Sequence, residues 1–245
     1  MPSSSSEDNL MERKDFLQTI PLFQELQSDD LDTLARDFRL RVYGRDDTIY
    51  HQGDESDEMY IIVEGTIRIY KISPAGSETS LVILSQGDIL GEFAMIDHRP
   101  RSATVKAVVP AKLLQIQSEK FVAYMREMPD LAIGMNRLLV EKIRWTATYA
   151  ETIAQYDAAG RLLHTLLRYN ELLGEEVEPG RFLLDLNLNQ TDLASLVGAR
   201  REWVNRLLRD WKKRGLIEYQ SGKLTILDLE AVEDERDNRI EANYH

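Results

Sequence analysis

The sequence predicts an α+β protein in which an N-terminal antiparallel β-barrel is followed by a long helix and a C-terminal helix-turn-helix with a hairpin wing. Between Arg41 and Gln117 the chain has short runs rich in β-branched residues and separated by glycines, which is typical of a barrel of short strands. After Pro129 a helical pattern continues for roughly 25 residues, longer than a typical globular helix. The segment LNLNQTDLASLVGARREWVNRLLRDWKKRGLIEYQSGKLTILD then has the periodicity of two short helices and a hairpin.

Length and composition indicate two domains and no membrane-spanning segment. The chain has 245 residues, of which 43% are hydrophobic and 29% are charged. No apolar run approaches the roughly 18 residues that cross a bilayer. The opening stretch MPSSSSEDN lacks the basic and apolar regions of a signal peptide, so we expect a disordered leader and a cytoplasmic protein with no membrane partner.

Residue types that carry catalytic and metal chemistry are scarce. The chain contains no cysteine, which excludes disulfides, thiolate nucleophiles and the usual structural zinc sites. The histidines are scattered without metal-ligand spacing: His51, His98, His164 and His245. No convincing carboxylate cluster accompanies the basic C-terminal segment, so we expect neither a metal site nor an enzyme.

A helical region precedes the predicted barrel. From about Asp15 to Leu40 the pattern is helical, and Ser28 is a good N-cap before apolar residues at intervals of three and four. Within the barrel, VEGTI predicts a tight hairpin and SPAGSE a longer one.

A narrow stripe on the long helix predicts a helical partner. Its members lie at intervals of three and four residues: Met135, Leu139, Ile143, Thr146, Ala150 and Ile153. The stripe could pack onto the chain's own barrel, but a helix this long extends past a small barrel, so we interpret it as a homodimer interface. The hydroxyl of Thr146 in this stripe requires a hydrogen-bond partner.

The C-terminal segments predict a helix-turn-helix. Asp157 is suited to cap a helix and marks a hinge near Tyr156. Asn189 and Asp192 resemble a capping pair, and Gly198 falls at the turn between two helices. The second helix has an apolar face and a polar face: Val204, Leu207, Leu208 and Trp211 against Arg201, Glu202, Asn205, Arg206 and Arg209.

This second helix is basic although the whole chain has a net charge of −12. Residues 200–214 contain seven positive and two negative side chains, a local net charge of +5. A solvated amphipathic helix is the simpler interpretation, but the glycine turn and the following hairpin favour a DNA-reading helix. Arginine side chains match the O6 and N7 acceptors of guanine, whereas Glu202 accepts only from a donor such as the cytosine amino group. We expect Lys212, Lys213 and Arg214 to contact phosphate or solvent.

A second site is predicted in GEFAMIDHRPRSATV, residues 91–105. Glu92 and Arg101 are not at helical spacing, so they either form a structural salt bridge through a folded loop or hold a ligand. FAMID predicts one short helical turn, whose free N–H groups together with Arg101 suit a singly charged anion such as a phosphodiester. A carboxylate fits beside an anion when it accepts a hydroxyl proton, as the 2′-OH of a ribose would supply. The residues are compatible with a nucleotide-like ligand and leave the salt bridge open.

With these elements placed, residues 16–227 resemble the cyclic-AMP receptor protein family of bacterial transcription regulators. GDILGEFAMIDHRPRSATVKA resembles the phosphate-binding cassette of cyclic-nucleotide-binding domains. The resemblance implies that Gly91 and Glu92 hold the ribose hydroxyl, that Arg101 holds the cyclic phosphate, and that Thr146 contacts the base. The ligand-binding residues implied in this way are Gly91, Glu92, Phe93, Arg101, Ser102, Ala103 and Thr146.

In the predicted reading helix, RREWVNR is similar to the family's Arg-Glu-x-x-x-Arg pattern, which implies palindromic DNA with half-sites close to TGTGA. The DNA-binding residues implied are Asn189, Gln190, Arg200, Arg201, Glu202, Asn205 and Arg206. The chain departs from the family at Trp203 and Asn205, which are larger than expected, and at Arg200, which replaces a common serine cap. Ala147 replaces a serine that contacts the nucleotide across the dimer in the type protein.

Together these observations predict a homodimeric, cyclic-AMP-responsive transcription regulator. The predicted parts are a disordered leader (1–15), a jelly-roll cyclic-nucleotide-binding barrel (16–128), a dimerisation helix with hinge (129–156), a winged helix-turn-helix (157–227) and an acidic tail (228–245). The resemblance implies 3′,5′-cyclic AMP, rather than cyclic GMP, as allosteric effector, with double-stranded DNA as partner and RNA polymerase as a candidate partner. Ligand binding would set the two reading helices about one DNA turn apart. Two alternatives remain: a ligand-independent regulator of the same family, and a cyclic-nucleotide-binding regulatory subunit that acts through protein contacts.

Overall fold

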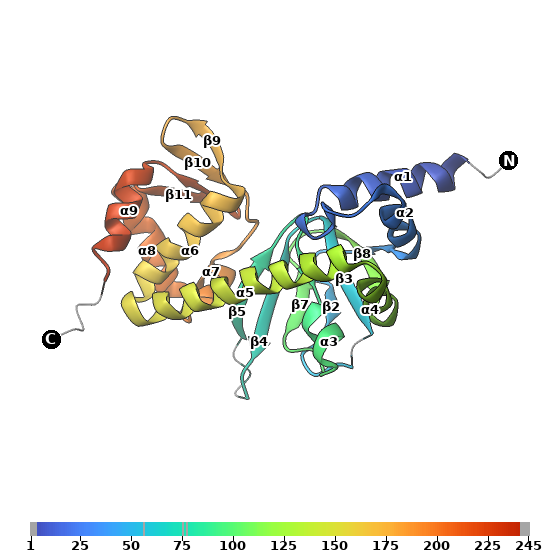
Figure 1. The fold of residues 1–245 in the computed structure, drawn as a ribbon. Coiled ribbons are helices and arrows are strands. Elements are labelled where there is room, and N and C mark those ends of the chain that lie inside the picture. Colours follow the sequence, from blue (N-terminus) through green and yellow to red (C-terminus); the bar gives the residue numbers. More distant parts are fainter. Residues whose placement is uncertain (1–3, 56, 75, 77, 241–245) are drawn as a thin grey trace. The chain divides into compact units, whose positions relative to one another are not determined.

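The computed structural model describes residues 4–55, 57–74, 76 and 78–240, which form two compact units (Figure 1). The first unit comprises residues 1–69 and 83–145, and the second comprises residues 70–82 and 146–245. The predicted α+β class, with a sheet-rich N-terminal part, a long helix and a C-terminal helix-turn-helix, is confirmed. No helix among the described residues is both long and apolar enough to cross a membrane.

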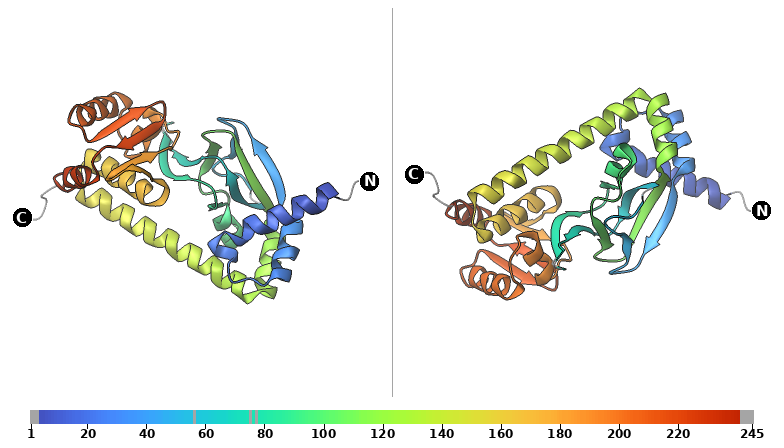
Figure 2. Two further views of the ribbon diagram at one scale, coloured as in Figure 1. Left: turned by 90° about the horizontal axis from the view of Figure 1, so that it is seen from above. Right: turned by 90° about the horizontal axis from the view of Figure 1, so that it is seen from below.

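The first unit begins with helices α1 (Ser4–Gln18) and α2 (Ser28–Asp37), separated by the short 3-10 helix η1 (Pro21–Phe23). The prediction of a disordered leader over residues 1–15 is therefore wrong from Ser4 onward. Arg13 Nη1 donates to the carbonyl oxygens of Ala35 at 2.8 Å and Phe38 at 2.5 Å, which fixes α1 against α2. The two helices lie side by side in the ribbon views of Figure 2. The Ser-rich start of α1 gives no amphipathic signal, so the helix depends on this tertiary packing.

Two four-stranded antiparallel sheets form the barrel. One has the order β1 (Arg39–Tyr43), β8 (Ala111–Gln117), β3 (Glu58–Glu64) and β6 (Ile89–Leu90). The other has the order β2 (Thr48–Tyr50), β7 (Thr104–Ala107), β4 (Ile67–Ile72) and β5 (Glu78–Leu84). Residues Ala75 and Ser77 of the predicted SPAGSE hairpin lie outside the described part of the chain.

Helices close one end of the barrel core. Phe23 packs edge-on against Phe38 and Phe121, with ring centroids 6.3 and 6.5 Å apart, and Phe121 lies on α4 (Ser118–Glu127). The first half of α5 (Pro129–Gln155) contributes Leu131 and Met135 to the same cluster. This end of α5 is therefore anchored to the barrel by apolar packing.

The predicted dimer stripe on α5 needs correction. Met135 is 1% exposed and packs in the barrel core, and Leu139 packs partly against it, so the start of the stripe faces the chain's own barrel. Ile143, by contrast, is 67% exposed. The later members of the stripe, Thr146, Ala150 and Ile153, are also exposed. A second set of exposed residues, at intervals of three and four, shares two members with the stripe and runs the length of the helix: Ile133, Asn136, Val140, Ile143, Ala147, Ala150 and Ala154. Burial against the barrel therefore removes Met135 and Leu139 from the predicted interface, which periodicity alone did not reveal.

The second unit includes α5 from Thr146 onward and contains the helix-turn-helix. Its helices are α6 (Ala158–Leu173), α7 (Gln190–Leu196), α8 (Arg201–Lys213) and α9 (Leu229–Asp237). Its sheet has the order β11 (Ile217–Gln220), β12 (Lys223–Ile226), β10 (Arg181–Leu184) and β9 (Glu175–Glu178). Strands β11 and β12 form the predicted wing.

Local capping explains where the helices of this unit begin. The side chain of Asp157 accepts a hydrogen bond from Gly160 N at 2.7 Å and caps α6, as its sequence context predicts. Asn189 and Asp192 form a reciprocal capping box at the start of α7. Gly198 adopts a φ of 66° in the turn before α8, a left-handed conformation that favours glycine.

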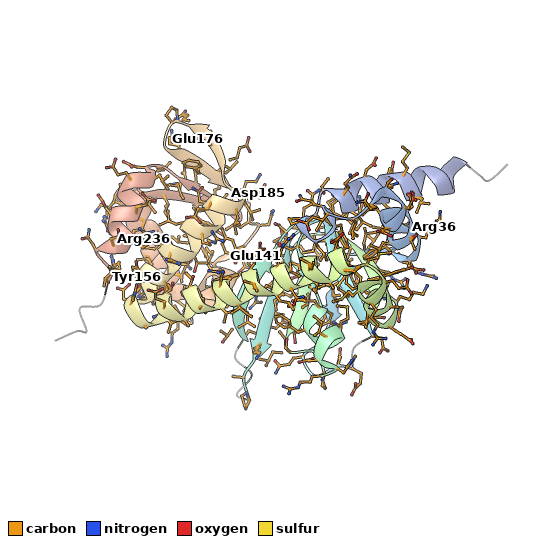
Figure 3. All side chains as sticks on the ribbon, in the orientation of Figure 1. Arg36, Glu141, Tyr156, Glu176, Asp185 and Arg236 are labelled. Atoms are coloured by element: carbon orange, nitrogen blue, oxygen red, sulfur yellow. The ribbon has the colours of Figure 1, made fainter. Side chains whose placement is uncertain are left out.

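The segment predicted as an acidic tail is largely helical. Residues 229–237 form α9, which packs against α6 and buries Val232. Tyr156 at the end of α5 and Arg236 on α9, both labelled in Figure 3, lie in the same part of this unit. Residues 241–245 of the predicted tail lie outside the described chain.

Candidate ligand and DNA-binding sites

The predicted cassette begins where strand β6 passes into α3 (Glu92–Asp97). Gly91 is the N-cap of this helix and has a φ of 87°. A Cβ atom at this position would lie 2.4 Å from Nη1 of Arg101 and 2.9 Å from the carbonyl oxygen of Glu58, so a larger residue would exclude the arginine. Glycine is therefore required by both the backbone conformation and the close approach of Arg101.

Arg101 is buried beneath this turn, with 4% of its surface exposed. Its Nη2 donates to the carbonyl oxygen of Glu58 at 2.7 Å, and its Nη1 donates to that of Gly91 at 3.2 Å. The guanidinium carbon lies 4.0 Å from the centroid of the Tyr50 ring, a cation–π distance. Burial raises the pKa of the Tyr50 hydroxyl, so this ring stays neutral beside the cation.

The guanidinium keeps unused hydrogen-bonding capacity. Its Nε atom is buried and has no hydrogen-bond partner among the described residues. A buried cation whose donors are met mainly by neutral carbonyl oxygens has room for an anionic partner, because charge-assisted bonds are the stronger ones. The residues of this turn therefore fit the phosphate of a nucleotide.

The sequence left open a structural salt bridge between Glu92 and Arg101. The structure does not form this salt bridge, because each residue pairs with another partner. Glu92 is 3% exposed, and its Oε1 accepts from Lys142 Nζ at 2.6 Å. The nearest carboxylate to Arg101 is that of Glu58, at 3.9 Å. The two charged groups of the cassette are thus held separately, by different partners.

Sequence reasoning missed Lys142. This residue lies on α5, and its Nζ also donates to the carbonyl oxygen of Ile89 at 2.8 Å. It lies four residues before Thr146 and therefore on the same helical face, which is the signal that could have pointed to it. Its ammonium group compensates the buried charge of Glu92, without which the carboxylate would be costly to bury.

Of the other predicted ligand residues, three lie in the cassette segment and one lies in the second unit. Phe93 and Ser102 are exposed at the cassette, and Ala103 is buried directly after Arg101. Thr146 belongs to the second unit, so its contact with a base in the cassette stays a prediction.

The helix-turn-helix presents most of its predicted DNA residues. Asn189, Arg200, Arg201, Glu202 and Arg206 are exposed. The remaining two predicted residues, Gln190 and Asn205, are partly buried. The side-chain oxygen of Asn189 accepts from Thr191 N at 2.8 Å and Asp192 N at 3.1 Å, so this oxygen is used to cap α7.

Two of the basic residues at the end of α8 are engaged within the protein. Lys212 Nζ forms an ion pair with Glu218 at 2.5 Å. Arg214 forms ion pairs with Glu235 and, at 3.3 Å, with Asp210. Lys212, Lys213 and Arg214 are all exposed to solvent, and their contact with phosphate stays a prediction.

Comparisons with known proteins match two separate parts of the chain. Residues 40–128 match the cyclic nucleotide-binding domain family, and residues 160–235 match the Crp-like helix-turn-helix domain family. A CRP-like cAMP-activated global transcriptional regulator from Mycobacterium tuberculosis is 26% identical over 86% of this chain and 94% of its own length. The cyclic AMP receptor protein of Thermus thermophilus is 27% identical over 87% of this chain and 95% of its own length.

A solved structure has the same fold. The c-di-GMP responsive global regulator CLP of Xanthomonas campestris superimposes with a TM-score of 0.69 and 19% identity, over 82% of this chain and 99% of that chain. The fold and the two matched domains define a DNA-binding transcription regulator with a cyclic nucleotide-binding domain rather than an enzyme. The chain belongs to the CRP family of such regulators.

Proposed function

We propose that the protein is a homodimeric transcription regulator whose DNA binding is switched on by 3′,5′-cyclic AMP. The observation that carries the proposal is the buried Arg101 guanidinium, whose Nε has no partner among the described residues and whose neighbour Glu92 is a buried carboxylate. Arg101 would hold the cyclic phosphate, and Glu92 would accept a hydrogen bond from the ribose 2′-OH. Ser102 and the amide of Ala103 would complete the phosphate cradle.

The exposed face of α5 supports dimerisation. The alternation of three and four residues along Val140, Ile143, Ala147 and Ala150 is the spacing of a coiled-coil seam. Small residues in the second half of this seam would allow two helices to approach closely. A pair of chains would present two α8 helices to a palindromic site, with half-sites similar to TGTGA, and RNA polymerase is a candidate partner of the DNA-bound dimer.

In the proposed mechanism, nucleotide binding biases the junction between α5 and α6, near Asp157, toward the arrangement that binds DNA. A ligand shifts such an equilibrium only by its difference in affinity for the two arrangements. We propose that Thr146 supplies part of that difference by contacting the base.

The proposal is tested by isothermal titration calorimetry with cyclic AMP, cyclic GMP and c-di-GMP, together with a DNA mobility-shift assay with and without each nucleotide. We expect cyclic AMP to bind and to increase the affinity for DNA. DNA binding that no nucleotide changes would support a ligand-independent regulator, and a response to c-di-GMP alone would reject cyclic AMP as the effector.

Lys142 is expected to strengthen nucleotide binding. Replacing it with glutamine leaves Glu92 as a buried charge without its counter-ion, which would repel the nucleotide phosphate. We expect the Lys142→Gln variant to bind cyclic AMP about tenfold more weakly, ~1.4 kcal/mol, in calorimetry. Lys142→Arg should retain most of the affinity, and Arg144→Gln, at an exposed position on the same helix, should leave it unchanged. Tighter binding to Lys142→Gln would instead show that the lysine blocks the site.

Base reading and phosphate contact on α8 are separable by mutation. Glu202→Ala should relax base preference at one position of the half-site in a binding-site selection, because its carboxylate discriminates between base donors. Lys213→Ala should weaken binding to all sequences alike and lower the slope of log affinity against log salt by about 1, because one lysine–phosphate ion pair is removed. The same selected motif for wild type and Glu202→Ala would contradict the role given to Glu202.

A further inference from the structure

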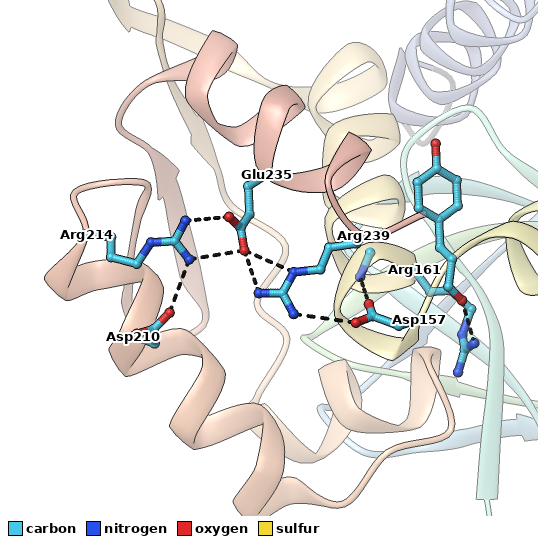
Figure 4. Close-up of polar contacts among 8 residues, drawn as sticks. Asp157, Arg161, Asp210, Arg214, Glu235 and Arg239 are labelled. Atoms are coloured by element: carbon cyan, nitrogen blue, oxygen red, sulfur yellow. Dashed lines mark hydrogen bonds and ion pairs between the residues drawn. The ribbon is translucent and has the colours of Figure 1, made fainter. Parts of the chain in front are cut away.

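Residues 228–240 form a segment of the second unit that we call the C-terminal clamp (Figure 4). It consists of Asp228, α9 and the residues that follow the helix, and Asp228 caps α9 by accepting from Ala231 N at 3.0 Å. The clamp contacts both the end of α8 and the junction between α5 and α6. These are the reading element and the hinge of the proposed function.

At one end the clamp binds the residue that caps the C-terminus of the reading helix. Arg214, the C-cap of α8, donates through both terminal nitrogens to the carboxylate of Glu235 on α9, with Nη1 to Oε1 at 3.1 Å and Nη2 to Oε2. Glu235 is only 7% exposed. The hydrogen bond from Arg214 lowers the pKa of Glu235 to about 2, and Arg239 contributes in the same direction. This is the paired, bidentate geometry of strong arginine–carboxylate contacts.

At the other end the clamp binds the hinge. Arg239 donates to Oε1 of Glu235 from Nη2 at 2.7 Å and from Nε at 3.1 Å. Its Nη1 lies 3.5 Å from Oδ2 of Asp157, and its carbonyl oxygen accepts from Asp157 N at 3.2 Å. One residue further, Ile240 forms an isolated β-bridge with Tyr156. Both the carboxylate and the backbone amide of the residue that caps α6 are therefore held by Arg239.

The first turn of α6 is shaped to receive this segment. Gly160 is buried, and a Cβ atom there would lie 2.7 Å from Cβ of Arg239 and 2.8 Å from a ring carbon of Tyr156. Any other residue at this position would force Arg239 or Tyr156 to shift. A continuous chain of contacts thus runs from Asp210 and Arg214 through Glu235 and Arg239 to the hinge.

We propose that Glu235 and Arg239 are positioning residues that transmit movement of the α5–α6 junction to the reading helix α8. A displacement of Asp157 would be passed to α8 through Arg239, Glu235 and Arg214, because each link is an ion pair or a hydrogen bond. The inference rests on the proposed function, since it specifies how nucleotide binding reaches the DNA-reading element.

The test compares the full-length variants Arg239→Ala and Glu235→Gln with the wild type. The control variant is Arg236→Ala, because Arg236 lies on the same helix and its Nε donates to the adjacent Asp237 rather than to Glu235. DNA affinity is measured with and without cyclic AMP at one salt concentration, on the duplex that the wild type selects. In both clamp variants the two affinities should converge, so that the activation ratio falls about tenfold, whereas Arg236→Ala should retain the wild-type ratio. Equal weakening of both affinities with an unchanged ratio would show a merely structural role and overturn the proposal.

Hydrogen exchange separates failure of this inference from failure of the proposed function. If no nucleotide changes the DNA affinity of the wild type, the proposed function is contradicted. The coupling through the clamp is then tested by hydrogen exchange alone. Arg239→Ala should accelerate amide exchange both at residues 157–161 and at residues 210–216, since one break loosens both ends. Faster exchange at only one end, or at neither, would refute the coupling.

Discussion

Replacing Arg101 with leucine is expected to weaken cyclic AMP binding about a hundredfold, ~3 kcal/mol, or to abolish it in calorimetry. Arg101 is the buried cation of the cassette, and leucine removes the charge and all donors to the phosphate while keeping an apolar stem against Tyr50. Arg101→Lys should lie between the two, because a lysine keeps the charge but not the planar set of donors.

The matched control for this prediction is Arg99→Leu. Arg99 lies two residues away, and its side chain is 82% exposed. It should bind cyclic AMP as the wild type does. A cooperative melting transition like that of the control would show that Arg101→Leu is folded. If this folded variant bound cyclic AMP with unchanged affinity, the assignment of the phosphate site would be rejected.

Replacing Glu235 with glutamine should destabilise the second unit by about 3 kcal/mol at pH 7, because Arg214 and Arg239 would lose their shared buried counter-ion. The effect should depend on pH. The pKa of Glu235 falls from 4.5 in the unfolded chain to about 2 in the folded one, so its ion pairs contribute fully above pH 4.5. Their contribution is lost as the pH falls through about 2.

The measurement is urea denaturation of both proteins between pH 7 and pH 2, followed by tryptophan fluorescence, since Trp203 and Trp211 lie in this unit. The difference in the free energy of unfolding should shrink steadily below pH 4.5. Glu233→Gln, at an exposed position on the same helix, should match the wild type throughout. A difference that stays constant with pH would mean that the carboxylate charge of Glu235 does not stabilise the unit.

Local chemistry in the sequence was sufficient for much of the fold. Asp157 and the pair Asn189 and Asp192 cap their helices as expected, because capping depends on residues three positions apart. The short β-branched runs became the barrel strands. The cassette was also readable, because Gly91, Glu92 and Arg101 lie within one short segment.

Long-range pairing was beyond the reach of the sequence. Lys142 lies fifty positions after Glu92 in the sequence, and no spacing rule predicts that the two side chains pair. Met135 and Leu139 of the predicted stripe pack against the barrel while its later members are exposed, because only packing decides which apolar residues of a helix are covered.

The two ends of the chain show the same limit. Residues 4–15 and 229–237 have polar compositions that predict a leader and a tail, yet both are helical. Arg13 binds carbonyl oxygens at the end of α2 and Glu235 binds Arg214 and Arg239, so single long-range contacts stabilise helices whose own periodicity is weak. The sequence by itself thus determined the order of the main elements and the caps of α6 and α7. Its prediction of Ser28 as an N-cap is wrong, because Ser28 is the first residue of α2 and Gln27 precedes it without a side-chain cap. The tertiary structure decided which charges pair and which helical face stays free, because both depend on residues that are distant along the chain.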